Sequence, residues 1–183
     1  MAFSLAEGAA LLWIQEFLRG AVLDPIVSFY TQLGNAGLLW IALSLLLLIW
    51  PKTRRAGFAG LVALLLSLIF TNGILKHLVS RPRPWLTLTG LVPLVVEKDP
   101  NSFPSGHTCA AFAAAVAWWR TLPDRRLKVA GLVLAVLMGL SRLYVGVHYP
   151  SDVLGGAVFG TLYGLLAVFI VSRLRPVKKT VSP

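Results

Sequence analysis

The chain has 183 residues, of which 57% are hydrophobic and only 13% are charged, and its formal net charge is +10. Soluble domains carry about a quarter charged residues, so this composition excludes an ordinary soluble domain and predicts an all-α integral membrane protein. The positive charge could indicate a nucleic-acid partner, but it is clustered between apolar stretches, which favours a membrane protein without nucleic acid.

Residues 3–20 predict an amphipathic helix. Trp13 and Phe17 share one face, while Gln15 and Arg19 lie on the other. We expect this helix to lie in the membrane interface rather than to cross the bilayer. A sixth spanning helix in this region is the alternative, although it would bury two glutamates and an arginine in lipid.

Five further stretches are apolar enough to be spans, against the roughly 20 residues that a spanning helix needs. They cover residues 25–51, 56–75, 104–119, 129–147 and 153–172. The third and fourth contain His107 and Arg142, and ionisable groups at membrane depth are functional candidates. We therefore predict one interfacial helix and five transmembrane helices, a six-helix core that forms a single domain over residues 1–183.

Eleven of the seventeen basic residues fall on one side of the membrane if these spans alternate. They are Lys52, Arg54, Arg55, Arg120, Arg125, Arg126, Lys128, Arg173, Arg175, Lys178 and Lys179. This positive-inside pattern places their loops in the cytoplasm and predicts a multi-pass protein of the plasma (inner) membrane. Lys76, Arg83 and Arg142 depart from the pattern, which indicates a chemical role on the extracytoplasmic side.

The longest loop runs from Ser80 to Phe103, and four prolines in it argue against any helix there. We expect the loop to fold over a site on the outer face as a rim or lid. Its two carboxylates, Glu97 and Asp99, are not expected to have a catalytic role. The single cysteine, Cys109, cannot form an intrachain disulfide, and its small neighbours favour a packing role.

Two cations lie close in sequence where the second span ends. Lys76 is near the end of that span, and Arg83 follows between Pro82 and Pro84, which favour an extended backbone. If the helix stops near Ser80, the two side chains can converge. Ordinary interfacial anchoring is the alternative interpretation of this pair.

A second block, Pro104 to His107, opens the third span. A helix N-terminus presents unpaired N–H groups to an anion, Gly106 permits close approach to the main chain, and Ser105 adds a hydroxyl. A plain helix cap with a buried, satisfied histidine is the alternative.

A third block, Ser141, Arg142, His148 and Asp152, surrounds the turn between the last two spans. Asp152 can accept the Nδ1 proton of His148 and leave Nε2 free as a nucleophile. Asp152 could also simply favour the N-terminus of its helix.

Together the three blocks resemble the signature of the type-2 phosphatidic acid phosphatase superfamily. That signature is a lysine, six residues and Arg-Pro, then Pro-Ser-Gly-His, then Ser-Arg, five residues, His, three residues and Asp; every specified position is matched between Lys76 and Asp152. The resemblance extends to small bacterial enzymes that hydrolyse undecaprenyl pyrophosphate.

The resemblance implies a role for each motif residue. His148 would attack phosphorus and form a phosphohistidine, Asp152 would orient it, and His107 would protonate the leaving oxygen and then help activate water. The phosphate oxygens would be held by Lys76, Arg83, Arg142, Ser105 and the Gly106 backbone. Three cations take the place of a metal, so we expect no metal or other cofactor.

The function predicted from the sequence is hydrolysis of a lipid phosphate or pyrophosphate at the outer face, with undecaprenyl pyrophosphate as the first choice. Phosphatidylglycerophosphate, phosphatidate and lipid A are alternative substrates. A vanadate-dependent haloperoxidase and a non-enzymatic lipid-phosphate binder are alternatives of another class. The sequence gives no signal for the oligomeric state.

Overall fold

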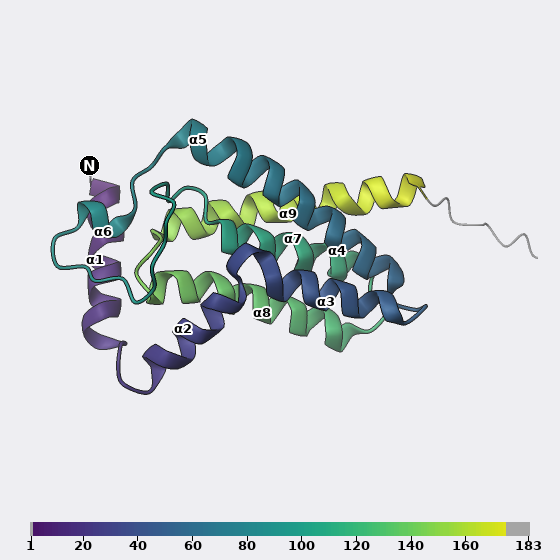
Figure 1. The fold of residues 1–183 in the computed structure, drawn as a ribbon, viewed down its shortest axis with the longest axis horizontal. Helices are drawn as coiled ribbons and strands as arrows, with labels where there is room; N and C mark the ends of the chain where they lie inside the picture. The colour runs from purple at the N-terminus through teal and green to yellow at the C-terminus, as the bar shows by residue number, and fades with distance from the viewer. Residues whose placement is uncertain (1, 175–183) are drawn as a thin grey trace, which may run out of the picture.

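The computed structural model describes residues 2–174, and the basic residues Arg175, Lys178 and Lys179 therefore lie outside the described part. The helices are α1 (Ala2–Phe17), α2 (Leu23–Leu33), η1 (Asn35–Gly37), α3 (Leu38–Ile49), α4 (Arg54–Ser67), η2 (Leu68–Leu75), α5 (Lys76–Val79), α6 (Pro84–Thr87), α7 (Gly106–Thr121), α8 (Arg125–Tyr144) and α9 (Pro150–Leu174). Figure 1 shows an elongated bundle of α3, α4, α7, α8 and α9, with α1 and α2 at one end. The predicted all-helical fold is confirmed over residues 2–174.

Helix α7 occupies the centre of the bundle and packs against α4, α8 and α9. Its contact with α9 is close because glycines face it: a Cβ at Gly164 would lie 2.7 Å from the carbonyl oxygen of Ala113, and one at Gly156 would lie 2.7 Å from that of Ser105. Small residues of this kind let helix backbones approach closely in membranes. The tight packing fixes the helix that carries His107 against the helix that carries Asp152.

Three helical segments are long and apolar enough to cross a membrane: Arg54–Val79, Arg125–Tyr144 and Pro150–Leu174. A fourth span is possible if the pair Leu23–Leu33 and Asn35–Ile49, bent by 53°, crosses as one unit. Helix α7 has only 16 residues and is short for a span. The structure thus supports three or four spans over residues 2–174, and five spans remain a prediction.

The first predicted span, residues 25–51, is not one straight helix. The chain turns at η1, where Ala36 has a φ of 51° and Gly37 a φ of 72°, both in the left-handed region. These angles cannot continue a right-handed helix, so α2 ends and α3 begins in a new direction. The turn places Asn35 beside His107, at the bundle end that holds the polar blocks of the sequence.

The second predicted span ends in a π-helical segment, η2, that leads directly into α5. The helix stops at Ser80, which has a φ of 46°, as expected from the sequence. Because π-helical turns shift the register of the side chains that follow, they occur often at functional sites. Here the segment carries Asn72 and leads into Lys76, and both residues line a cavity at the same end of the bundle as His107 and His148.

The loop from Ser80 to Phe103 covers the same end of the bundle (Figure 1). Within the loop, Pro82 and Asn101 form an isolated antiparallel bridge, and a hydrogen bond from the Leu94 N–H to the Val145 carbonyl ties the loop to the end of α8. The prediction that the loop contains no helix is wrong for α6, because Pro84 occupies its first position, where a missing N–H costs nothing.

Helix α1 lies across the same end and packs against the loop and the α8–α9 turn through Leu11, which contacts Leu91 and Tyr149. Its apolar residues Trp13 and Phe17 are exposed. An apolar face directed away from the protein fits the predicted interfacial helix, which remains a prediction.

The basic turns lie at the opposite end of the bundle. Lys52 lies in the α3–α4 turn, Arg125 begins α8 and Arg173 lies in the last turn of α9. The arrangement agrees with the clustering that the sequence predicted for the inner side.

Candidate active site

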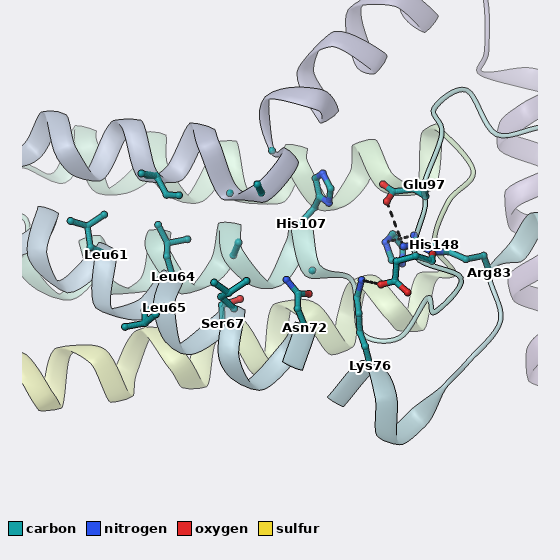
Figure 2. A pocket seen from close by; sticks show the side chains of 18 residues that line it. Leu61, Leu64, Leu65, Ser67, Asn72, Lys76, Arg83, Glu97, His107 and His148 are labelled. Atoms are coloured by element: carbon teal, nitrogen blue, oxygen red, sulfur yellow. Dashed lines mark hydrogen bonds and ion pairs between the residues drawn. The ribbon is translucent and has the colours of Figure 1, made fainter. Parts of the chain in front are cut away.

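Residues from all three sequence blocks line one cavity of about 560 Å³, namely Lys76, Arg83, Gly106, His107 and His148. Arg142 lines a neighbouring pocket and is linked to this cavity by Glu97, which lines both. Figure 2 shows Lys76, Arg83, His107 and His148 around one part of it. The other part lies between α3 and α4 and is lined by apolar side chains, including those of Ile41, Leu61, Leu64, Leu65 and Leu68. The cavity therefore joins a charged, polar end to an apolar end.

Two of the three predicted phosphate-binding cations are almost completely buried. Arg83 and Arg142 are each 1% exposed, and Lys76 is 9% exposed. Arg83 has the extended backbone that its flanking prolines predict, with φ of −68° and ψ of 153°. Arg142 Nη1 donates to Thr31 Oγ1 at 2.6 Å. Buried guanidinium groups need an anionic partner, so both of these side chains require a negatively charged group beside them.

The anionic partners in the structure come from the loop. Glu97 pairs with Arg142. It also lies 3.5 Å from Arg83 Nη2, and Lys76 Nζ lies 2.5 Å from Asp99 Oδ2 (Figure 2). Burial alone would raise the pKa of Asp99, but hydrogen bonds from Lys76 and from the Asn101 N–H hold it below its ordinary value. From the sequence, these two carboxylates are not expected to have a catalytic role; the structure places both on the cations of the site.

His148 is buried in the turn between α8 and α9, and the direction of its hydrogen bond fixes its tautomer. Arg83 Nη1 lies 3.0 Å from Nε2 of His148. Since a guanidinium can only donate, Nε2 accepts and carries no proton. Burial, and then the charges of Arg83, Arg142 and Lys76, hold the pKa of His148 well below its ordinary value. The imidazole is therefore neutral, with a lone pair on the nitrogen that faces the cations.

Asp152 stands on the other side of the same ring, at the start of α9. Its Oδ2 lies 3.6 Å from His148 Nδ1 and accepts the Tyr149 N–H at 2.8 Å. Its Oδ1 accepts from Arg81 Nη1 at 2.7 Å. Within residues 2–174, Nδ1 of His148 has no hydrogen-bond partner, so the carboxylate is close to, but not yet within, hydrogen-bonding distance. The juxtaposition matches the predicted pair.

His107, in the first turn of α7, lines the same cavity as His148. Its Nε2 lies 3.0 Å from Oδ1 of Asn35, which comes from η1. The two predicted catalytic histidines therefore face one space from different elements.

Ser105 and Gly106 are placed differently from one another. Gly106 lines the cavity, and a Cβ there would lie 3.0 Å from Asn72 Oδ1. Ser105 is fully buried as the N-cap of α7, where its Oγ accepts from Thr108 Oγ1 at 3.0 Å. The close approach at Gly106 agrees with an anion-binding role, whereas Ser105 shapes the helix end.

Asn35 and Asn72 are site residues that the sequence motifs do not name, and they lie inside apolar stretches that hold no charge. A polar amide within such a stretch is the feature that could have identified them. Cys109 is buried beside Thr71, as its small neighbours predicted. Over residues 2–174, no group of three or more His, Cys, Asp or Glu side chains is arranged to hold a metal ion.

Comparison with known proteins agrees with this geometry. The model of the PAP2 superfamily matches residues 56–176. An undecaprenyl-diphosphatase of Sulfolobus acidocaldarius is 31% identical over 87% of this chain and 75% of its own length. The undecaprenyl-diphosphatase BcrC of Bacillus subtilis is 31% identical over 86% of this chain and 80% of its own length.

A solved structure resembles the whole fold. The crystal structure described as the first transmembrane PAP2 type phosphatidylglycerolphosphate phosphatase from Bacillus subtilis superposes with a TM-score of 0.77 at 28% identity, covering 97% of this chain and 90% of that one. Three sequence blocks, one cavity that unites them, and relatives that share both length and fold lead to one conclusion: the chain belongs to the PAP2 superfamily and is a membrane lipid phosphatase.

Proposed function

We propose that the protein hydrolyses a lipid phosphate or pyrophosphate through a phosphohistidine at His148, and that undecaprenyl pyrophosphate is its substrate. The observation that carries the proposal is the two-part cavity, in which buried cations and two histidines lie at one end and leucines of α4 at the other. A lipid phosphate has the matching division between an anionic headgroup and an apolar chain.

The chemistry follows from the position of each group. The unprotonated Nε2 of His148 faces the cations that would hold the phosphate, so it can attack phosphorus while the P–O bond to the leaving group breaks. His107, across the cavity, would protonate the leaving oxygen. Water then attacks the phosphohistidine, His107 accepts its proton, and free phosphate and neutral His148 are regenerated.

Binding of the phosphate requires an exchange of anions. In the structure Glu97 and Asp99 occupy the cations that the substrate needs. We infer that the phosphate oxygens take the positions of these carboxylates and that the loop moves aside. Three positioned cations supply the charge that phosphoryl transfer needs, so the proposed mechanism uses no metal.

The choice of undecaprenyl pyrophosphate rests on the names of two similar relatives and on the apolar end of the cavity. The outward orientation rests on the basic turns at the opposite end of the bundle. Phosphatidylglycerophosphate is the competing substrate, because the similar solved structure is named for it.

The test is phosphate release from purified protein on a panel of undecaprenyl pyrophosphate, phosphatidylglycerophosphate, phosphatidate and lipid A, with a chelator present. The proposal expects the highest kcat/KM for the pyrophosphate and no loss on chelation. His148→Ala and His107→Ala should each abolish release, whereas His77→Ala, at an exposed histidine on α5, should keep it. Near-normal turnover by the His148 variant, or loss of activity with the chelator, would overturn the mechanism.

A further inference from the structure

An ion-pair network connects the N-terminal helix to the catalytic carboxylate. Arg81, in the loop after α5, donates through Nη1 to Asp152 Oδ1 at 2.7 Å and to Ser151 Oγ at 2.6 Å. Its other terminal nitrogen, Nη2, donates to Glu7 Oε2 at 2.8 Å. One guanidinium therefore bridges Asp152 and a glutamate of α1.

Arg81 is held in place by further contacts. Its guanidinium carbon lies 4.0 Å from the centroid of the Tyr149 ring, and its carbonyl accepts from the Ser102 N–H at 2.7 Å. Because a guanidinium is planar and its N–H groups donate in fixed directions, Arg81 constrains the orientation of its partners as well as balancing their charge. Asp152 cannot rotate its carboxylate without breaking the bond to Arg81.

Glu7 completes the network from α1. It is 4% exposed, and both of its oxygens are used, because Oε1 accepts the Ser151 N–H at 2.7 Å while Oε2 accepts from Arg81. Burial alone would raise the pKa of Glu7, yet the hydrogen bonds from Ser151 and Arg81 hold it below its ordinary value. Glu7, from α1, is thus an ionised group that contacts the first turn of α9, the same turn that carries Asp152.

We propose that Glu7 and Arg81 are positioning residues for the hydrolysis: Glu7 orients Arg81, and Arg81 orients the Asp152 carboxylate toward Nδ1 of His148. A buried ion pair adds little net stability, so stability alone gives weak reason for such a network. The network ends at the carboxylate that must accept a hydrogen bond from Nδ1–H of His148. The present 3.6 Å gap between Oδ2 and Nδ1 has to close by about 0.5 Å for a good hydrogen bond. Helix α1 is accordingly part of the active site and not only a membrane contact.

This inference rests on the proposed role of His148, and kinetics of purified variants can separate the two. Glu7→Gln and Arg81→Gln should each lower kcat by about tenfold to a hundredfold, the usual effect of losing a charge-assisted hydrogen bond. KM and the inhibition constant for orthophosphate should stay within about twofold, because neither residue contacts the cavity cations. The unchanged phosphate inhibition also shows that the variant is folded.

A double-mutant cycle tests the order of action. If Glu7 acts through Arg81, the variant carrying both substitutions should be no slower than Arg81→Gln alone. Arg81→Lys, which keeps the charge but cannot reach both carboxylates, should retain more activity than Arg81→Gln. It also serves as a folded alternative if Arg81→Gln does not accumulate.

The matched control is Gln15→Ala. Gln15 is on the same helix and bonds the loop at Gly90 and Val92, away from Asp152. It should keep the wild-type kcat. An equal loss of kcat in Gln15→Ala, additive effects in the cycle, or wild-type kcat in Glu7→Gln would overturn the inference. Absence of phosphate release from the wild-type protein would instead overturn the proposed function.

Discussion

Replacing Glu97 by glutamine should strengthen phosphate binding. The substitution keeps the size of the side chain and removes the negative charge that pairs with Arg142 and lies near Arg83. If substrate phosphate has to displace this carboxylate, the fraction of protein with free cations limits the apparent affinity. Removing the competitor should therefore lower both KM and the inhibition constant for orthophosphate.

The size of the effect follows from the bond that is lost. A hydrogen bond to a charged group contributes about 1.5–3 kcal/mol net, and about 1.4 kcal/mol corresponds to tenfold, so the two constants should fall by about tenfold to a hundredfold. The upper part of this range is favoured because Arg142 and Arg83 are each 1% exposed, so water compensates them poorly when they are unpaired. The change in kcat should be smaller, since Glu97 has left the cations before the chemical step.

The assay is steady-state phosphate release with orthophosphate as a product inhibitor, at fixed ionic strength. Glu16→Gln is the matched control, because it makes the same chemical change at an exposed position on α1. It should leave both constants unchanged. The reasoning is refuted if Glu97→Gln leaves KM and the inhibition constant for orthophosphate unchanged. It is also refuted if both constants rise, because Glu97 would then support the cations and not compete for them.

Two further predictions concern the nucleophile and the packing beneath it. Because the pKa of His148 lies below 6.5, kcat/KM should remain high as the pH falls through 6.5 and should decline only at lower pH, where the imidazole gains a proton; an acid limb centred at or above pH 6.5 would contradict the assignment. Gly164→Ala should destabilise the α7–α9 contact by about 1–3 kcal/mol, because its Cβ would lie 2.7 Å from the Ala113 carbonyl oxygen. Thermal unfolding in detergent measures this, and Gly73→Ala, where no described atom lies within 4 Å of the new Cβ, is the control that should show no loss.

The motif residues could be predicted from sequence because local chain features place them. Pro82 and Pro84 dictate the extended backbone of Arg83. Because α9 begins at Pro150, Asp152 lies in its first turn, beside His148 in the preceding turn. Hydropathy also located every bundle helix. The bend at Ala36 was missed, because a left-handed turn inside an uninterrupted apolar stretch leaves no trace in hydropathy.

The contacts of the loop and of α1 could not be predicted in the same way. Glu97 lies in a segment without periodicity, and its partner Arg142 is 45 residues away. Glu7 was interpreted as one charge of an interfacial helix, and its partner Arg81 is 74 residues away. Long-range pairs of this kind depend on how elements dock, and docking of a loop and a terminal helix carries no local sequence signal.

Charge balance nevertheless provides a reason for both sets of contacts. The chain has only seven acidic residues, and four of them form ion pairs with basic side chains around the site: Glu7, Glu97, Asp99 and Asp152. They pair with four basic residues, Lys76, Arg81, Arg83 and Arg142. An apolar bundle could not hold four unpaired cations, because each buried charge without a partner costs several kcal/mol.

The motif that specifies phosphate-binding cations therefore also requires counter-charges that the motif does not name. Two of the four acids, Glu7 and Asp152, bind Arg81 and remain in place during the proposed reaction. The other two, Glu97 and Asp99, bind the cations that a phosphate must reach. A terminal phosphate group carries about two negative charges, so its binding replaces the charge of the two displaced carboxylates and leaves the net charge of the site nearly unchanged.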